Sequence, residues 1–168
     1  SPFLQQMYVE RVDCPPEVNL ETAEVLTIPV VFHVVHLGES VGDGTNISDE
    51  QIISCIDNLN HRFRGDINAL SSLTDVYDEY ELSLVLDSKI EFCLASRDPN
   101  NNPTDGILRH NGSGIFYNGE SYAQDGVSGV GSQSGVDQSY LKTTLGCWDT
   151  NEYFNLWVVS EIDGNNGN

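Results

Sequence analysis

The sequence predicts an α/β (α+β) fold, in which a twisted mixed sheet is backed by helices. Two runs, at 28–37 and 153–162, are apolar on both strand faces, which is typical of strands that are covered on both sides. Between them, residues 49–63 carry apolar side chains at helical spacing. The order strand, helix, strand, long loop, strand therefore indicates one sheet with helices packed on it.

The chain of 168 residues is long enough for one domain with a real core. Residues 1–26 are expected to form an extended lead-in, because Cys14-Pro-Pro16 disfavours helix. Proline fixes its own backbone and restricts the residue before it. The domain itself is expected to cover residues 27–168.

The helix predicted at 49–63 has a clear beginning. Ser48 suits the N-cap, and Gln51 completes a capping box three residues later. One stripe is expected to face the sheet, formed by Ile52, Ile56, Leu59 and Phe63. A shorter helix is predicted at 75–86, and a strand follows at 89–95.

Residues 106–138 are rich in Gly, Ser and Asn and read as a long structureless loop. Such a loop within one domain is unusual and is either functional or mobile. We expect 111–139 to be the most mobile or most partner-dependent segment, because it lacks the apolar periodicity needed to bury itself.

The charge excludes some classes of partner. The chain has seven Lys and Arg residues and 26 Asp and Glu residues, which gives a net charge of −19. Such a surface repels phosphate backbones and anionic lipid, so the sequence argues against nucleic-acid and membrane-surface binding. No run is long and apolar enough to span a bilayer.

Four cysteines stand at Cys14, Cys55, Cys93 and Cys147, without Cys-x-x-Cys spacing. An even count in an acidic chain suggests a secreted protein with up to two disulfides. Three pairings are possible for four cysteines, and the sequence does not choose among them. For Cys55, a small buried hydrophobe is an equal alternative.

The polar motifs indicate no catalytic centre. The four histidines, His33, His36, His61 and His110, show no His-Glu-x-x-His pattern, and a structural role is the better interpretation for each. Hard oxygen ligands alternate in one acidic loop and suggest a possible calcium site, with an Asx-rich turn as the alternative. The candidate ligands are Asp98, Asn100, Asn102 and Asp105.

Four strings, in order along 27–162, resemble the front half of the catalytic domain of pappalysin/ulilysin-like zinc metallopeptidases, of the metzincin clan. They are Ile28-Pro-Val-Val-Phe-His-Val-Val-His36; Ile47-Ser-Asp-Glu-Gln-Ile52 with Leu59-Asn-His-Arg-Phe-Arg64; Ile90-Glu-Phe-Cys-Leu-Ala95 with Asp98-Pro99 and Asp105-Gly-Ile107; and Trp148-Asp-Thr-Asn-Glu-Tyr-Phe-Asn-Leu-Trp-Val-Val159.

The resemblance implies that residues 27–168 form an N-terminal subdomain that stops before the zinc motif, and that 1–26 are a lead-in or the end of a pro-segment. It implies zinc in the intact protein, with a downstream glutamate as general base. No zinc ligand or catalytic residue is carried over to this chain. Cys14 resembles the inhibitory cysteine of latent metzincins, although Pro-Pro follows it; a structural disulfide is the preferred interpretation.

We therefore expect the N-terminal portion of a secreted or cell-surface bacterial endopeptidase, acting on protein or peptide substrates when intact and inactive as this segment alone. The alternative is a non-catalytic module or exported cargo, recognised by a secretion-system, outer-membrane or other binding partner. The sequence beyond residue 168 would discriminate between the two.

Overall fold

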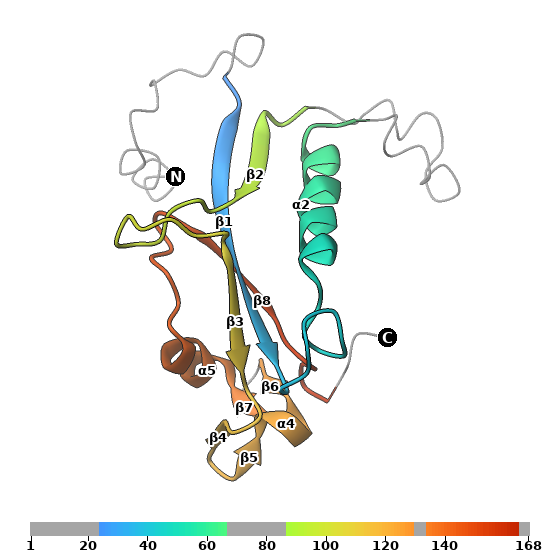
Figure 1. Cartoon of the computed structure of the whole chain (residues 1–168), viewed down its shortest axis with the longest axis vertical. Coiled ribbons are helices and arrows are strands. Elements are labelled where there is room, and N and C mark those ends of the chain that lie inside the picture. Colours follow the sequence, from blue (N-terminus) through green and yellow to red (C-terminus); the bar gives the residue numbers. More distant parts are fainter. Residues whose placement is uncertain (1–23, 67–86, 130–133, 165–168) are drawn as a thin grey trace, which may run out of the picture.

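The computed structural model describes residues 24–66, 87–129 and 134–164. Its centre is a four-stranded sheet around β1 (Leu26–His36), which pairs with β2 (Ile90–Leu94), β3 (Ile107–Asn111) and β8 (Phe154–Val158) (Figure 1). The predicted fold class is confirmed. All three pairings within this sheet are parallel, so these four strands show no mixed pairing.

β1 is bonded along both of its edges. Val30 is in register with Leu94 of β2 and also with Phe154 of β8, so these two strands lie on opposite edges. Farther along, Phe32 is in register with Ile107 of β3 and with Leu156 of β8. β2 and β3 therefore follow one another along the same edge of β1, and β8 occupies the other.

Helix α2 (Asp49–Phe63) covers one face of the sheet. Its N-terminus has the predicted capping box between Ser48 and Gln51. Ile52 and Ile56 are buried against the side chains that β1 and β2 present to this face, which are Val30, Phe32, Val34 and Phe92. The predicted stripe is confirmed, with Leu59 half-buried and Phe63, at the helix end, 38% exposed.

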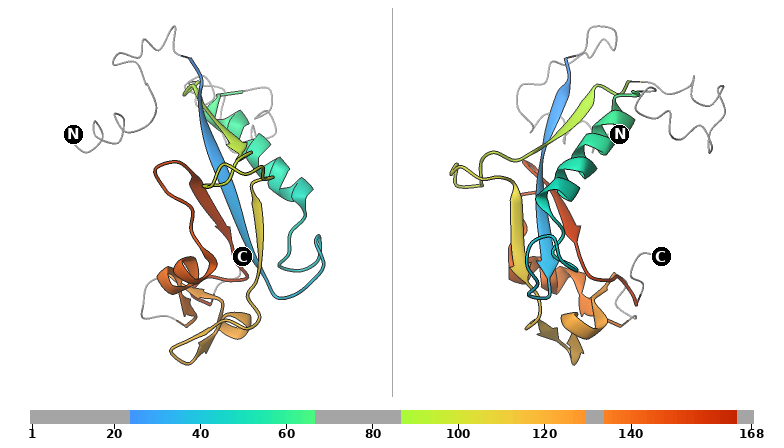
Figure 2. Two further views of the ribbon diagram at one scale, coloured as in Figure 1. Left: turned by 60° about the vertical axis from the view of Figure 1, so that its left-hand side comes forward. Right: turned by 45° about the vertical axis from the view of Figure 1, so that its right-hand side comes forward.

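The opposite face is covered by short elements between β3 and β8. They are β4 (Phe116–Tyr117), β5 (Glu120–Ser121), α4 (Tyr122–Asp125), β6 (Val127–Ser128), β7 (Val136–Asp137) and α5 (Gln138–Leu145). They gather toward the carboxyl ends of β1 and β3 (Figure 2). A second core lies here, formed by Val35, Tyr122, Val127, Val136 and Leu141.

The expectation of a structureless loop at 106–138 is thus wrong for its described residues. Tyr122 is fully buried, and its hydroxyl donates to the Val35 carbonyl oxygen at 2.6 Å and accepts from the Ser160 backbone N–H at 3.0 Å. At least one glycine serves a tight turn instead: Gly126 has φ +59°, and a Cβ there would clash with Glu161.

Two predicted segments cannot be compared with the structure. The helix predicted at 75–86 lies outside the described residues, and so does most of the lead-in at 1–26. In the part that is described, no helix is long and apolar enough to cross a membrane.

Ile52 and Ile53 offer a matched pair for testing the helix orientation. Ile52 is fully buried, whereas Ile53 is 48% exposed. We expect Ile52→Ala to lower the free energy of unfolding by about 2–5 kcal/mol, because it removes buried methyl groups and leaves a cavity. Ile53→Ala should stay within about 0.5 kcal/mol. Denaturant melts of the two variants measure this, and equal losses would show that the helix faces are wrongly placed.

Candidate functional site

Two of the four histidines come together on the face of the sheet opposite α2. The register sets His33 beside Trp157 of β8, and Val35, two residues on, beside His110 of β3. Side chains two residues apart on a strand share a face. His33, His110 and Trp157 are therefore neighbours although they come from three strands.

The His33 ring is the centre of this group. It is fully buried and is stacked on the Trp157 indole, with ring centroids 4.0 Å apart and planes 7° apart. Its Nδ1 lies 3.2 Å from His110 Nε2, and its Nε2 lies 2.9 Å from Asn155 Oδ1. Both ring nitrogens are thus engaged within the protein.

The hydrogen bonds of Asn155 indicate which ring nitrogen of His33 carries the proton. Its Nδ2 donates to the carbonyl oxygens of Trp148 and Tyr153, at 3.0 and 3.3 Å, so its Oδ1 must be the acceptor. That oxygen takes bonds from the Trp148 backbone N–H and from His33 Nε2. The His33 proton therefore sits on Nε2, and Nδ1 accepts from His110 Nε2.

The electrostatics favour the neutral form of both rings. Burial lowers the pKa of His33, and its bond to Asn155 offsets this in part. Burial also lowers the pKa of His110, and the nearby His33 and His36 add to that effect. The two rings form a hydrogen-bonded pair on the sheet, which agrees with a structural role.

The other two histidines lie elsewhere. His36 Nδ1 accepts from the Gly38 backbone N–H at 3.0 Å, and exposed His61 on α2 pairs with Asp66 at 3.2 Å. Across residues 24–66, 87–129 and 134–164, no group of three or more His, Cys, Asp or Glu could hold a metal ion. The donor set of the described residues therefore does not fit zinc.

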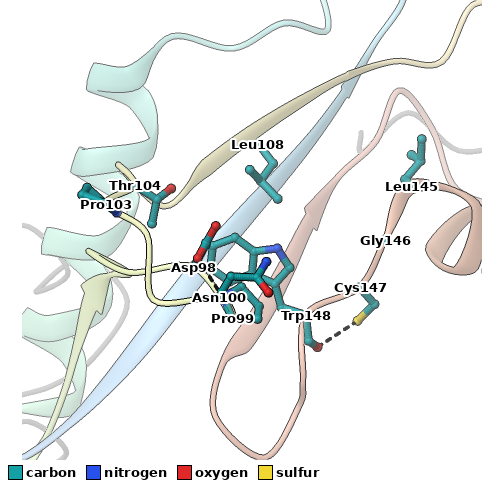
Figure 3. A pocket seen from close by; sticks show the side chains of 10 residues that line it. All are labelled: Asp98, Pro99, Asn100, Pro103, Thr104, Leu108, Leu145, Gly146, Cys147 and Trp148. Atoms are coloured by element: carbon teal, nitrogen blue, oxygen red, sulfur yellow. Dashed lines mark hydrogen bonds between the residues drawn. The ribbon is translucent and has the colours of Figure 1, made fainter.

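A pocket of about 500 Å³ lies beside this network. One wall is the loop at 98–104, the other is the turn at 145–148, and Leu108 of β3 lies between them. In Figure 3 the side chains of Asp98 and Asn100 lie close to the Trp148 indole. Because Asn155 binds both backbone groups of Trp148, the pocket wall and the His33 network are directly connected.

The predicted calcium ligands form an Asx-type turn. Asp98 Oδ1 accepts from the backbone N–H groups of Asn100 and Asn102, at 2.9 and 2.8 Å. Asp98 Oδ2 accepts from Asn102 Nδ2 at 3.0 Å, and Asp105 Oδ1 accepts from the Ile107 backbone N–H at 3.0 Å. These oxygens are used within their own loop, as the alternative interpretation has it. Calcium binding stays an untested prediction.

The described cysteines are exposed. Cys55, Cys93 and Cys147 are not joined to one another, and Cys14 lies outside the described residues. The interpretation of Cys55 as a buried small hydrophobe is wrong, because it lies on the exposed side of α2. A disulfide that includes Cys14 stays a prediction.

Comparison with known proteins finds relatives among solved structures. No family model and no curated protein matches the chain. A structure of mirolysin in complex with a compound is 35% identical over 80% of this chain and 42% of its own, with a TM-score of 0.57. Mature mirolysin of Tannerella forsythia, in complex with a cleaved peptide, is 33% identical with the same coverage and a TM-score of 0.55.

A third structure, a promirolysin mutant of Tannerella forsythia, is 31% identical over 93% of this chain and 42% of its own, with a TM-score of 0.56. Mirolysin is a pappalysin/ulilysin-like metzincin. The predicted pappalysin-like resemblance is therefore confirmed. The chain is a metallopeptidase-related domain and spans 42% of the length of these mirolysin structures.

Sequence reasoning missed the His33–His110 pair because it placed His110 in a loop. A usable signal was present in Asp105-Gly-Ile107, because the short strand β3 begins at Ile107 and runs to Asn111. Once β3 is aligned in parallel with β1, residues 33, 35 and 110 fall on one face. The pair then follows from strand geometry.

The lowered pKa values of His33 and His110 predict acid sensitivity. Below their ordinary pKa of 6.5 the unfolded chain binds more protons at these sites than the folded chain does. The free energy of unfolding should therefore fall as the pH is lowered through that value. Denaturant melts between about pH 7 and pH 5 should show a smaller loss for His110→Gln than for the unmutated chain. An identical pH dependence in the two proteins would contradict this.

Proposed function

We propose that this chain is the N-terminal subdomain of a secreted, zinc-dependent endopeptidase, with residues 27–168 forming the frame of its catalytic domain. The observation that carries the proposal is the 31–35% identity to mirolysin over 80–93% of the chain. One of those mirolysin structures holds a cleaved peptide, which supports peptides or proteins as the substrates of the intact protein.

The proposal places zinc on residues outside this chain. The described histidines are bonded to one another, to Asn155, to backbone or to Asp66, so they serve structure. In the intact protein, zinc would supply an activated water for peptide-bond hydrolysis. The residues of this chain would form the sheet, support it with α2 and frame one wall of the substrate cleft.

An incompletely covered apolar surface supports the frame role. On the α2 side of the sheet, the β1 side chains Val30, Phe32 and Val34 are at most 2% exposed. Their β8 neighbours Leu156 and Val158 are only half-buried, and Phe154 is 49% exposed. Parallel sheets are normally covered on both faces. We therefore assign this surface, Phe154, Leu156 and Val158 of β8, to contact with the rest of the catalytic domain.

Localisation outside the cytoplasm is part of the proposal. The net charge of −19 favours solubility in a salty or extracellular medium, and the resemblance to mirolysin points the same way. The alternative, an exported cargo or binding module recognised by a secretion partner, has the same localisation. The cargo or binding-module alternative differs from the protease proposal because it requires no catalytic residues downstream.

The activity test compares the 168-residue chain with the protein extended by the downstream coding sequence. We expect the short chain to retain no stoichiometric zinc after dialysis and to cleave no casein. The extended protein should bind one zinc per chain and cleave casein, and replacing its downstream histidine pair should remove both properties. Zinc held by the short chain, or a downstream region without such a pair, would overturn the proposal and favour the binding-module alternative.

Phe154 tests the contact surface without an activity assay. Phe154→Asp should change the melting temperature of the short chain little, because the ring is half exposed there. In the extended protein the same change should be strongly destabilising, because it buries a charge against an apolar partner. Phe116→Asp is the matched control, since Phe116 is 63% exposed in β4. Equal effects in the short and extended proteins would show that β8 stays uncovered.

A further inference from the structure

The pocket between 98–104 and 145–148, called here the Trp148 pocket, has walls that are held in place by side-chain bonds. Asp98 closes the first loop on itself, and Asn155 binds both backbone groups of Trp148 in the second. The shape of the pocket thus does not depend on a ligand to order it. Preorganisation of this kind lowers the entropic cost of binding.

The lining includes one aromatic and one acidic side chain. The half-buried Trp148 and Asp98 both line the pocket (Figure 3). The side-chain amide and the backbone N–H of Asn102, followed by the Asn100 N–H, lower the pKa of Asp98. The carboxylate therefore keeps its negative charge across the whole neutral and mildly acidic range.

A second aromatic ring lies beside Trp148. Tyr153 packs edge-on against Trp148, with ring centroids 4.8 Å apart. Burial raises the pKa of Tyr153, and the nearby carboxylates of Glu152 and Asp98 add to this. Among the described residues that line the pocket, none is Lys or Arg.

We infer that the Trp148 pocket binds an organic cation of the size of a lysine or arginine side chain. A cation gains from the face of an indole and from an adjacent carboxylate, and this pocket offers both beside rigid apolar walls from Pro99, Pro103 and Leu108. Electrostatic complementarity with a chain of net charge −19 favours the same ligand class.

The inference is independent of the proposed protease function. Leu108 is in register with His33, so it lies on the sheet face opposite α2 and opposite the β8 surface assigned to the rest of the catalytic domain. Binding here needs neither zinc nor any residue beyond 168. A negative result would therefore leave the proposed function untouched, and failure of that function would leave this pocket in place.

The direct test is an NMR titration of the ¹⁵N-labelled 168-residue chain. The probes are N-acetyl-lysine amide and N-acetyl-arginine amide, with N-acetyl-norleucine amide as the uncharged control. We expect saturable shifts of the Trp148 indole N–H with a millimolar Kd for the cations, weakened by added salt. The Trp157 indole, stacked on buried His33, is the internal reference and should not follow the titration.

Charge-matched variants locate the site. Asp98→Asn removes the charge, while the introduced amide oxygen can still accept from Asn100 and Asn102, so the turn is kept. It should weaken cation binding several-fold. Asp57→Asn makes the same change on exposed α2 and should leave binding unchanged. Trp148→Leu, followed on the backbone amides of 98–104, should abolish it. Preserved ¹H–¹⁵N dispersion verifies folding of each variant.

Three outcomes would overturn the inference. Equal shifts with the norleucine probe would show an apolar pocket without cation preference. Unchanged affinity in Asp98→Asn would remove the carboxylate from the site. Absence of saturable shifts at Trp148, with either cation, would mean that the pocket binds no such group.

Discussion

The rest of the fold depends on the centre of β1, residues 30–35, being buried on every side. Val30, Val31, Val34 and Val35 have no exposed area, and parallel partners bond along both edges of the strand. A strand in this position must be covered on both faces. Even-numbered side chains build the core under α2, and odd-numbered ones build the core under the short elements. One eleven-residue strand therefore determines which layer each neighbouring residue enters.

Elements with strong periodicity were predictable from the sequence, and those stabilised by distant polar partners were not. β1, α2 and β2 were expected close to their observed bounds because apolar side chains mark them, and β8 was expected in the right place but ends earlier, at Val158. β3 carries Arg109 and His110 in its centre, and these give no strand pattern. Arg109 is bonded to Asn46, to the Ile47 carbonyl and to Asp49 near the start of α2, contacts that only the folded chain brings together.

The candidate site shows the same division. The Asx turn at Asp98 is local, so sequence reasoning could name it as the alternative to calcium. The His33–His110 contact joins residues 77 positions apart, and Asn155 is 122 positions from His33. Such contacts follow from strand register, which one sequence does not reveal. Tyr122 was missed for a related reason, since a single buried ring in a Gly- and Ser-rich stretch produces no periodicity.

The two faces of the sheet are covered to different extents, and this asymmetry bears on function. Opposite α2, His33, His110, Asn155 and Tyr122 are engaged in bonds within the chain, and a second core lies there. On the α2 side, Phe154 packs against Phe92, with centroids 6.2 Å apart, and Phe92 packs against Phe63. Of the two outer rings, Phe63 remains 38% exposed and Phe154 remains 49% exposed. A row of aromatic rings that is buried at its centre and open at its ends is suited to receive another apolar element. In the proposed protease, the catalytic residues would therefore be carried by segments that complete this face, and the described residues would hold them in place.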